Sequence, residues 1–264
     1  MIIRASVGFL LGTLMLSTLG FVWATYLMAG VLFIILVAIA YAMPAGLPTG
    51  RKGAKFSEVF SKSANVNWLS VARLFLFVAR DVWFLVGIPI YFYSVLSDGT
   101  AEGNRTAFFI IGTFMAAWII LYGLIQGLAP KVLRAGARSE EALIADARRW
   151  AFLLSAIPTA LACAAFMATG PSDWLTALLI VGLLAFGAVF AINSSLHSYL
   201  ILAFTKSERV TMDVGFYYMA NAAGRLIGTV LSGAAYQMGG LVLLLACATV
   251  MVLMSMIAAG QLRS

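Results

Sequence analysis

Long uninterrupted runs of apolar residues dominate this sequence. A helix of about 20 apolar residues can cross the ~30 Å hydrocarbon core of a bilayer, and in lipid every backbone N–H and C=O group must be paired within its segment. Hydrophobic residues make up 63% of the 264 residues and charged residues only 10%, whereas soluble domains carry about 25% charged residues. The sequence therefore predicts an all-α, polytopic membrane protein.

The apolar runs predict eight membrane-spanning helices. Their approximate bounds are 6–22, 26–43, 68–96, 107–128, 150–169, 174–204, 212–237 and 240–261. The longest connection contains two Pro and three Gly residues, which is typical of a linker. The predicted organisation is a pair of helices at 1–43, a cytoplasmic linker at 44–66 and a six-helix unit at 67–264.

The basic residues indicate how the chain is oriented. Thirteen of the 17 Lys and Arg residues lie on one side of the predicted membrane, in or beside alternate connections. The other side carries only Arg105, together with Asp98, Glu102 and Asp173. Short basic loops are typical of the cytoplasmic face, so both termini are expected to be cytoplasmic. The net charge of +7 then reflects topology, and the expected partner is the lipid bilayer and not a nucleic acid.

Three arginines lie inside predicted spans, where a charge costs about 2.5–3.5 kcal/mol on insertion scales and so needs a function or a partner. Arg80 and Arg225 each lie about twelve residues, or roughly 18 Å, into spans of the same direction, so they can share one depth near the midplane. Arg73 lies nearer the cytoplasmic end and could extend to the interface. It is seven residues from Arg80, so both should project from one helix face with Phe77 and Phe84.

These charges allow three interpretations. In the first, Arg80 and Arg225, with Arg73, form a bidentate site for a carboxylate or a phosphate, the groups that guanidinium forks match best. In the second, Asp81 is a proton carrier tuned by a neighbouring arginine. In the third, Asp81 pairs with an arginine only to neutralise buried charge. Because Arg80 and Asp81 are adjacent and point about 100° apart on a helix, pairing across helices is expected instead of a mutual pair.

Two uncharged residues complete the candidate binding set. Asn221 lies on the same predicted span as Arg225, and His197 lies near the cytoplasmic end of the span 174–204. A lone His without nearby carboxylates is a weak metal ligand, so we expect His197 to hydrogen-bond between helices, with substrate contact or gating as the alternatives. No metal, cofactor or catalytic residue is expected, because HExxH, GxSxG and Walker motifs are missing from the sequence.

Two features are expected to shape the helices. Gly87, followed by Pro89, can bend the span 68–96 beyond the midplane. A stripe of small residues at every fourth position allows close packing of the span 212–237. The members of this stripe are Ala220, Gly224, Gly228 and Ser232.

The six-helix unit resembles the C-terminal half of a major facilitator superfamily transporter. It follows a cytoplasmic linker, and its third and sixth spans, 150–169 and 240–261, carry no charged residue. The spans 68–96 and 212–237 do carry charges. Such a division suggests neutral, lipid-facing support helices around a set that lines a polar cavity.

Five sequence stretches narrow this resemblance. They are FSKS at 60–63, NWLSVARLFLFVARDVW at 67–83, YGLIQGLAPK at 122–131, SLHSYLILAF at 195–204 and DVGFYYMANAAGR at 213–225. Together they are similar to the ArsJ-type organoarsenical efflux permeases, and the resemblance covers nearly the whole chain. Members of that family have twelve spans, so the resemblance implies a C-terminal half preceded by two helices of the N-terminal half, with about four spans not represented.

The resemblance also implies a substrate. ArsJ-type permeases are associated with export of 1-arseno-3-phosphoglycerate, which glyceraldehyde-3-phosphate dehydrogenase makes when arsenate replaces phosphate. It thus implies an efflux protein of the bacterial inner membrane that confers arsenate resistance, with this dehydrogenase as a functional partner and the proton gradient as driving force. The alternatives are a general organic-anion or drug exporter of the same superfamily, and a non-transporting membrane interaction protein.

Overall fold

The computed structural model describes residues 2–42, 63–133, 138–168, 170–205 and 209–263, with the backbone alone for residues 2–10. This part of the chain is all-helical and contains no strand. The helices are α1 (Ile2–Ala42), α2 (Ala64–Phe84), α3 (Gly87–Leu96), α4 (Ala101–Leu133), α5 (Glu140–Met167), α6 (Asp173–Phe204) and α7 (Val210–Ala259). Most of the predicted linker at 44–66, and the FSKS stretch up to its last residue, lie outside the described residues.

Six helices of the described part are long and apolar enough to cross a membrane, with α2 and α3 together forming one of them. The predicted number of eight separate helices differs from this count because two helices each contain two predicted spans. The ranges 6–22 and 26–43 both fall in α1, and the ranges 212–237 and 240–261 both fall in α7.

Both of these long helices are broken by glycine without an intervening loop. The backbone of α1 leaves helical geometry at Gly20, with φ 75° and ψ 171°. The backbone of α7 does so at Gly239 and Gly240, where Gly240 has φ 59° and ψ −149°. Such conformations carry little steric cost only when the residue has no Cβ. The predicted boundaries near residues 22–26 and 237–240 therefore correspond to sharp kinks.

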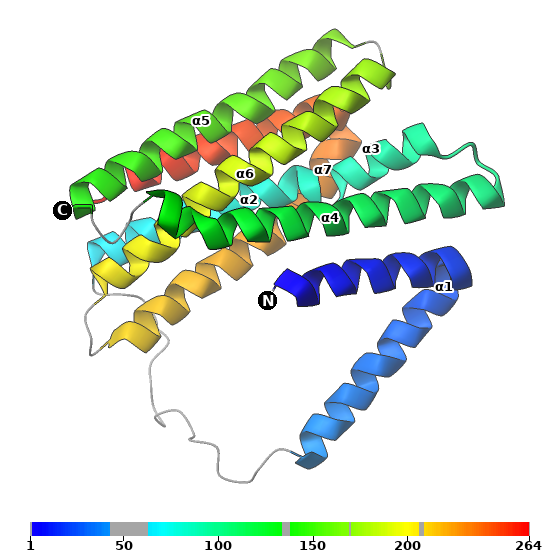
Figure 1. Cartoon of the computed structure of the whole chain (residues 1–264), viewed down its shortest axis with the longest axis horizontal. Coiled ribbons are helices and arrows are strands. Elements are labelled where there is room, and N and C mark those ends of the chain that lie inside the picture. Colours follow the sequence, from blue (N-terminus) through cyan, green and yellow to red (C-terminus); the bar gives the residue numbers. More distant parts are fainter. Residues whose placement is uncertain (1, 43–62, 134–137, 169, 206–208, 264) are drawn as a thin grey trace.

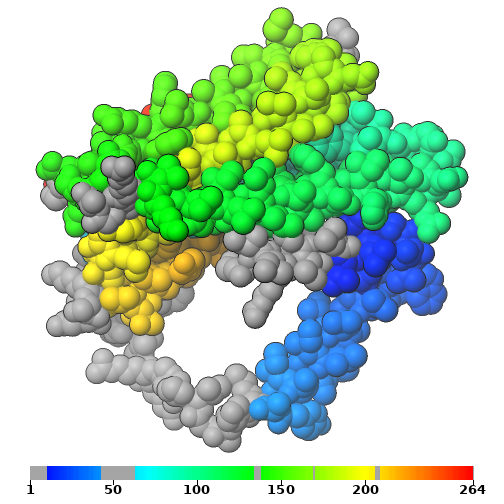
Figure 2. All heavy atoms as spheres, in the orientation of Figure 1, coloured from blue at the N-terminus to red at the C-terminus, as the bar shows by residue number. Residues whose placement is uncertain are grey.

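The two arms of α1 have different surroundings. The arm before Gly20 packs along α4, where the side chain of Thr13 fills the space beside Gly112 and the Arg105 Nε donates to the Ser17 carbonyl oxygen at 2.6 Å. The arm after Gly20 swings away from the bundle (Figures 1 and 2). Between residues 21 and 42 only Ala24 is buried. The second arm is thus an apolar helix with exposed side chains, as suits a segment surrounded by lipid.

The third predicted span is interrupted where a bend was expected. Helix α2 ends at Phe84 and α3 begins at Gly87. The Gly87 N–H donates to the Ser232 Oγ on α7 at 3.2 Å, which satisfies a backbone group freed by the break. The side chain of Leu244 occupies the space where a Cβ on residue 87 would stand.

Helices α2 and α7 form the most extensive contact among the described helices, and the stripe of small residues lies in it. A Cβ on Gly224 would collide with the Leu74 carbonyl oxygen, and one on Gly228 would lie 3.0 Å from the Val78 carbonyl oxygen. The two backbones are therefore nearly in contact, and the predicted packing role of the stripe is confirmed. This close approach brings the charged residues of α2 beside those of α7.

The alternate connections lie at opposite ends of the bundle (Figure 1). One end of the bundle contains the starts of α2, α5 and α7, the ends of α4 and α6, and the C-terminus. The other end contains the α3–α4 and α5–α6 connections. The described basic residues near the first end include Lys131, Arg138, Arg209 and Arg263. The second end carries Arg105 with Asp98, Glu102 and Asp173. The charges thus divide between the two ends.

Candidate functional site

A cavity of about 320 Å³ lies between α2, α4, α6 and α7. Its lining residues are Arg73, Phe77, Arg80, Phe84, Leu85, Trp118, Ile119, Tyr122, Gln126, Ser198, Tyr218, Asn221 and Arg225. Three of these described residues are arginines and none is acidic. Neither α5 nor the part of α7 beyond its glycine break contributes to the lining. The spans 150–169 and 240–261, which were expected to act as supports, fall in these two segments.

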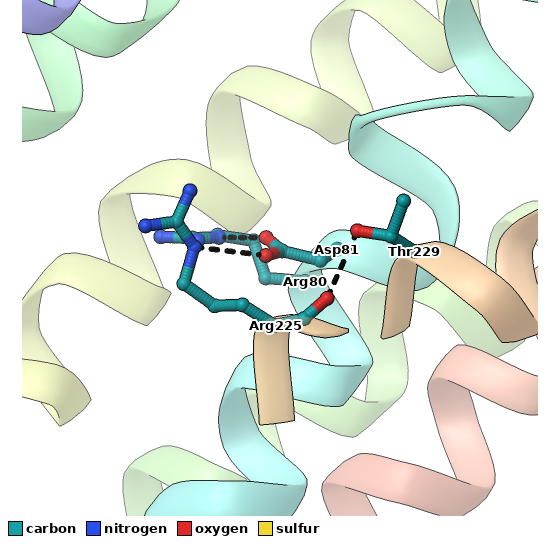
Figure 3. Close-up of polar contacts among 4 residues, drawn as sticks. All are labelled: Arg80, Asp81, Arg225 and Thr229. Carbon is teal, nitrogen blue, oxygen red and sulfur yellow. Dashed lines mark hydrogen bonds and ion pairs between the residues drawn. The ribbon is translucent and has the colours of Figure 1, made fainter. Parts of the chain in front are cut away.

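One carboxylate holds two of the arginines together. The Asp81 Oδ1 lies 2.5 Å from the Arg80 Nε, and its Oδ2 lies 3.3 Å from the Arg225 Nε on α7. The Asp81 side chain is 0% exposed, whereas that of Arg80 is 13% and that of Arg225 55% exposed. Figure 3 shows the two guanidinium groups converging on the carboxylate from different helices. The structure therefore brings Arg80 and Arg225 together, as their positions in the two spans led us to expect.

The expected choice of partner for Asp81 is only half right. The cross-helix pair with Arg225 is present, but the adjacent pair of Arg80 with Asp81 forms as well. The Cα–Cβ vectors of neighbouring helical residues diverge by about 100°, but the long arginine side chain can turn back over that angle. Side-chain reach therefore outweighs the backbone geometry on which the expectation was based.

The paired arginines keep part of their hydrogen-bonding capacity. Both contacts with Asp81 are made through Nε. In Figure 3 the terminal nitrogen atoms of Arg225 point away from the carboxylate. Two guanidinium groups and one carboxylate leave a net charge of one positive unit, so this group can still attract an anion and bind it through a guanidinium fork.

Arg73 lies deeper in the protein than the sequence indicates. It is 4% exposed, so the expectation that it extends to the membrane interface is wrong. Its NH1 donates to the Ser194 carbonyl oxygen at 3.0 Å and to the Ser194 Oγ at 2.8 Å. The Gln126 Nε2 on α4 donates to the same Oγ at 3.3 Å. Arg73 is therefore held by hydroxyl and carbonyl oxygens from α6 and has no ion pair with an acidic residue in the described part of the chain.

Phe77 links Arg73 with Arg80. The Cζ atoms of Arg73 and Arg80 lie 4.3 Å and 4.6 Å from the centroid of the Phe77 ring. Cation–π contacts of this kind contribute about 0.5–2 kcal/mol, more when they are desolvated. Arg73, Phe77, Arg80 and Phe84 all line the cavity, which confirms that they share one face of α2.

The two uncharged candidates have different positions. Asn221 lines the cavity, and its Oδ1 has no hydrogen-bond partner among the described residues. His197 is completely buried in α6, does not line the cavity, and has no partner at either ring nitrogen in that same part of the chain. The predicted interhelical hydrogen bond of His197 is therefore wrong, and the structure does not bring this residue to the cavity.

The sequence interpretation missed the wall that α4 contributes. Trp118 and Tyr122 stack with their rings 5.6 Å apart and only 2° from parallel, and Trp118 Nε1 donates to the Leu183 carbonyl oxygen at 2.8 Å. Gln126 lies one turn further along. The spacing of four residues between Trp118, Tyr122 and Gln126 is typical of one helix face and could have identified this wall.

Within the described residues, no three His, Cys, Asp or Glu side chains come together as metal ligands. No family model, no curated protein and no solved structure matches this chain. The chemistry of the cavity is therefore the basis for assigning a function.

Proposed function

We propose that the chain is a membrane transporter that exports an anionic organoarsenical, 1-arseno-3-phosphoglycerate, and thereby confers arsenate resistance. The observation that carries this proposal is a cavity inside an apolar helical bundle with three arginines and no acidic residue among its described lining residues. Charged side chains inside a membrane protein are costly and commonly mark the path of a substrate or an ion. Arginine in particular suits phosphate-like and carboxylate groups.

The size and walls of the cavity support a small organic anion. Small-molecule sites usually have volumes of about 300–1,000 Å³, so 320 Å³ is enough for a compact metabolite. Phe77, Phe84, Trp118 and Tyr122 provide apolar surface for the carbon skeleton, and the arginines provide forks for its anionic groups. Water is the usual solvent of such anions, so the guanidinium groups must replace the hydrogen bonds that are lost on entry.

The proposal includes an orientation and a setting. The end of the bundle with the basic connections faces the cytoplasm of a bacterium, in its inner membrane, and the proton gradient drives export. In this setting the chain acts as the C-terminal half of a major facilitator superfamily transporter with two further helices. Glyceraldehyde-3-phosphate dehydrogenase supplies the substrate on the cytoplasmic side.

A second candidate function is export of a broader range of organic anions. The aromatic wall of α4 favours it, because stacked Trp118 and Tyr122 bind flat or apolar groups without regard to arsenic chemistry. The two candidates differ in the anion that is transported, and a resistance assay with and without the dehydrogenase separates them.

The experiment is an arsenate-resistance assay in an arsenate-sensitive bacterial strain. The strain expresses the chain with or without glyceraldehyde-3-phosphate dehydrogenase. The variants are Arg80→Gln and Arg225→Gln, and the matched control is Arg149→Gln on α5, whose parent side chain is 76% exposed and lies outside the cavity. Membrane amounts of each variant are compared by immunoblotting.

We expect resistance that depends on the dehydrogenase, that is lost in both cavity variants and that is kept in the control. Full resistance in the double variant Arg80→Gln/Arg225→Gln would contradict the anion cavity. Resistance to unrelated organic anions, without any protection from arsenate, would support the broader exporter. No protection from any anion, with normal membrane insertion, would favour a non-transporting interaction protein.

A further inference from the structure

We infer that the cavity selects ligands that carry an anionic group at each end of a short chain, with Arg73 binding one end and the Arg80–Arg225 pair binding the other. This inference rests on the proposed function and deepens it, because it names a required substrate shape and gives Arg73 a separate role. We call the two parts the Arg73 subsite and the paired subsite.

The Arg73 subsite contains a buried cation that has no counter-ion among the described residues. Arg73 is only 4% exposed, and its NH1 donates only to the two oxygen atoms of Ser194. Its Nε has no hydrogen-bond partner among the described residues. A charge in such surroundings normally has a counter-ion, since an isolated buried ion costs several kcal/mol. Arg73 lines the cavity, so an anionic ligand group can supply that counter-ion.

The paired subsite contains a second positive charge of a different kind. The Asp81 carboxylate neutralises one of its two guanidinium groups, so Arg80 and Arg225 together retain one net positive unit. This subsite differs from the Arg73 subsite because the Asp81 carboxylate competes with a ligand for the two guanidinium groups. Each subsite thus carries a net charge of one unit, and the cavity as a whole matches a ligand with two negative groups.

Phe77 sets the spacing of the two subsites along α2. The Arg73 Cζ lies 4.3 Å and the Arg80 Cζ 4.6 Å from the centroid of this one ring, so the two carbon atoms are at most about 9 Å apart. Phe77 lies between the two arginines in the sequence and presents only apolar surface to the cavity. A ligand that spans it needs anionic ends joined by a few carbon atoms.

A ligand with one anionic group satisfies only one subsite. Inorganic phosphate, inorganic arsenate and short-chain monoanions would leave either Arg73 or the paired subsite without a counter-ion. A charged hydrogen bond contributes about 1.5–3 kcal/mol, which corresponds to about 10–100-fold in affinity. The cavity therefore discriminates between a two-ended anion and a one-ended anion of the same length.

Two stable probes test this inference on the purified full chain in lipid nanodiscs. 3-Phosphoglycerate carries a phosphate at one end and a carboxylate at the other, whereas glycerol 3-phosphate has the same phosphate but no carboxylate. Binding is measured by isothermal titration calorimetry. The protein variants are wild type, Arg73→Gln and the control Arg149→Gln, and the decisive quantity is the affinity ratio of the two probes within each variant, which does not depend on the active fraction.

We expect wild type and Arg149→Gln to bind 3-phosphoglycerate about 10–100-fold more tightly than glycerol 3-phosphate. In Arg73→Gln this ratio should fall to about one, because only the paired subsite remains. If Arg73→Gln does not fold, a series of linear dicarboxylates on the wild-type protein tests the requirement for two anionic ends without a variant. Its affinities should peak at a short chain length and fall at longer ones.

The outcomes separate this inference from the proposed function. Equal affinities for both probes in wild type, or a flat dicarboxylate series, would overturn the two-ended cavity and leave the proposed anion transporter in place. Failure of wild type to bind either probe would overturn the proposed function and the inference together. An unchanged ratio in folded Arg73→Gln would overturn the assignment of one end to Arg73.

Discussion

Asp81 is buried between two arginines, and this arrangement has two opposing effects on the cavity. The carboxylate compensates the charge of Arg80 and Arg225, which allows them to lie inside an apolar bundle. The same carboxylate competes with any anionic ligand for the two guanidinium groups. Stability and anion binding therefore depend on Asp81 in opposite directions.

The sequence was sufficient to predict some residue positions and not others. Depth and helical spacing placed Arg80 and Arg225 together and put Arg73 on the face of Phe77, because these properties depend only on helix geometry. The partners of Arg73 and His197 were not predictable, because they depend on how α6 is rotated against α2. Ser194 meets Arg73, whereas His197 packs in the interior without a hydrogen bond among the described residues.

We predict that Asp81→Asn raises the affinity for 3-phosphoglycerate about 3- to 10-fold, because an amide competes less strongly for the two arginines than a carboxylate does. The variant should also lose about 1–3 kcal/mol of stability, which is less than the full cost of breaking a buried pair because the Arg225 side chain is 55% exposed. Calorimetry and thermal unfolding in detergent measure the two effects.

The control for this prediction is Asp146→Asn. Asp146 pairs with Arg138 and Arg149 near the basic end of the bundle and does not line the cavity. It should leave ligand affinity unchanged. Weaker binding in folded Asp81→Asn would show that the carboxylate positions the arginines for the ligand and does not compete with it.

At the scale of the helices, glycine determines both the closest contact and the sharpest breaks. The stripe on α7 was predictable from its spacing, because residues at every fourth position share one helix face. The break at Gly239–Gly240 falls at a predicted boundary between spans and the break at Gly20 falls near one, but neither was predicted as a kink within a continuous helix. A sequence shows that glycine permits an unusual φ value, whereas the surrounding packing decides whether it is adopted.

We predict that Gly224→Val destabilises the protein by about 1–3 kcal/mol, because the new side chain would collide with the Leu74 backbone and push α2 and α7 apart. Thermal unfolding in detergent measures this loss. The matched control is Gly233→Val on the same helix, where a Cβ meets nothing within 4 Å. Equal unfolding temperatures for the two variants would contradict the close packing of α2 against α7.

At the scale of the whole molecule, four of the described helical segments line the cavity, whereas α5 and the last part of α7 do not. The contrast between charged and uncharged spans identified α2 and the first part of α7 as walls, but it could not separate α5 from α4 and α6, because the predicted spans 107–128 and 174–204 are uncharged as well. Charge did not identify α4 as a wall of the cavity, because α4 contributes the aromatic side chains of Trp118 and Tyr122 and the amide of Gln126, and no charged side chain. Tertiary packing selects which face of such a helix meets the cavity, and charge patterns do not report it.

We predict that the basic end of the bundle faces the cytoplasm. In a background with Cys163→Ser and Cys247→Ser, single cysteines are introduced as Glu102→Cys at the start of α4 and Glu140→Cys at the start of α5, both exposed positions. A membrane-impermeant maleimide added to intact spheroplasts should label the first variant and not the second. Labelling of the second variant alone would reverse the proposed orientation.

The most direct test of the central claim is arsenic uptake into everted membrane vesicles that contain the chain. The outside solution contains arsenate, glyceraldehyde 3-phosphate, an oxidised nicotinamide cofactor and glyceraldehyde-3-phosphate dehydrogenase, so that the labile arseno-ester forms at the cytoplasmic face. Arsenic inside the vesicles is then measured by mass spectrometry. The account predicts that arsenic accumulates only when the dehydrogenase is active and when Arg73, Arg80 and Arg225 are intact. Accumulation from arsenate alone, or undiminished accumulation after replacement of all three arginines by Gln, would contradict it.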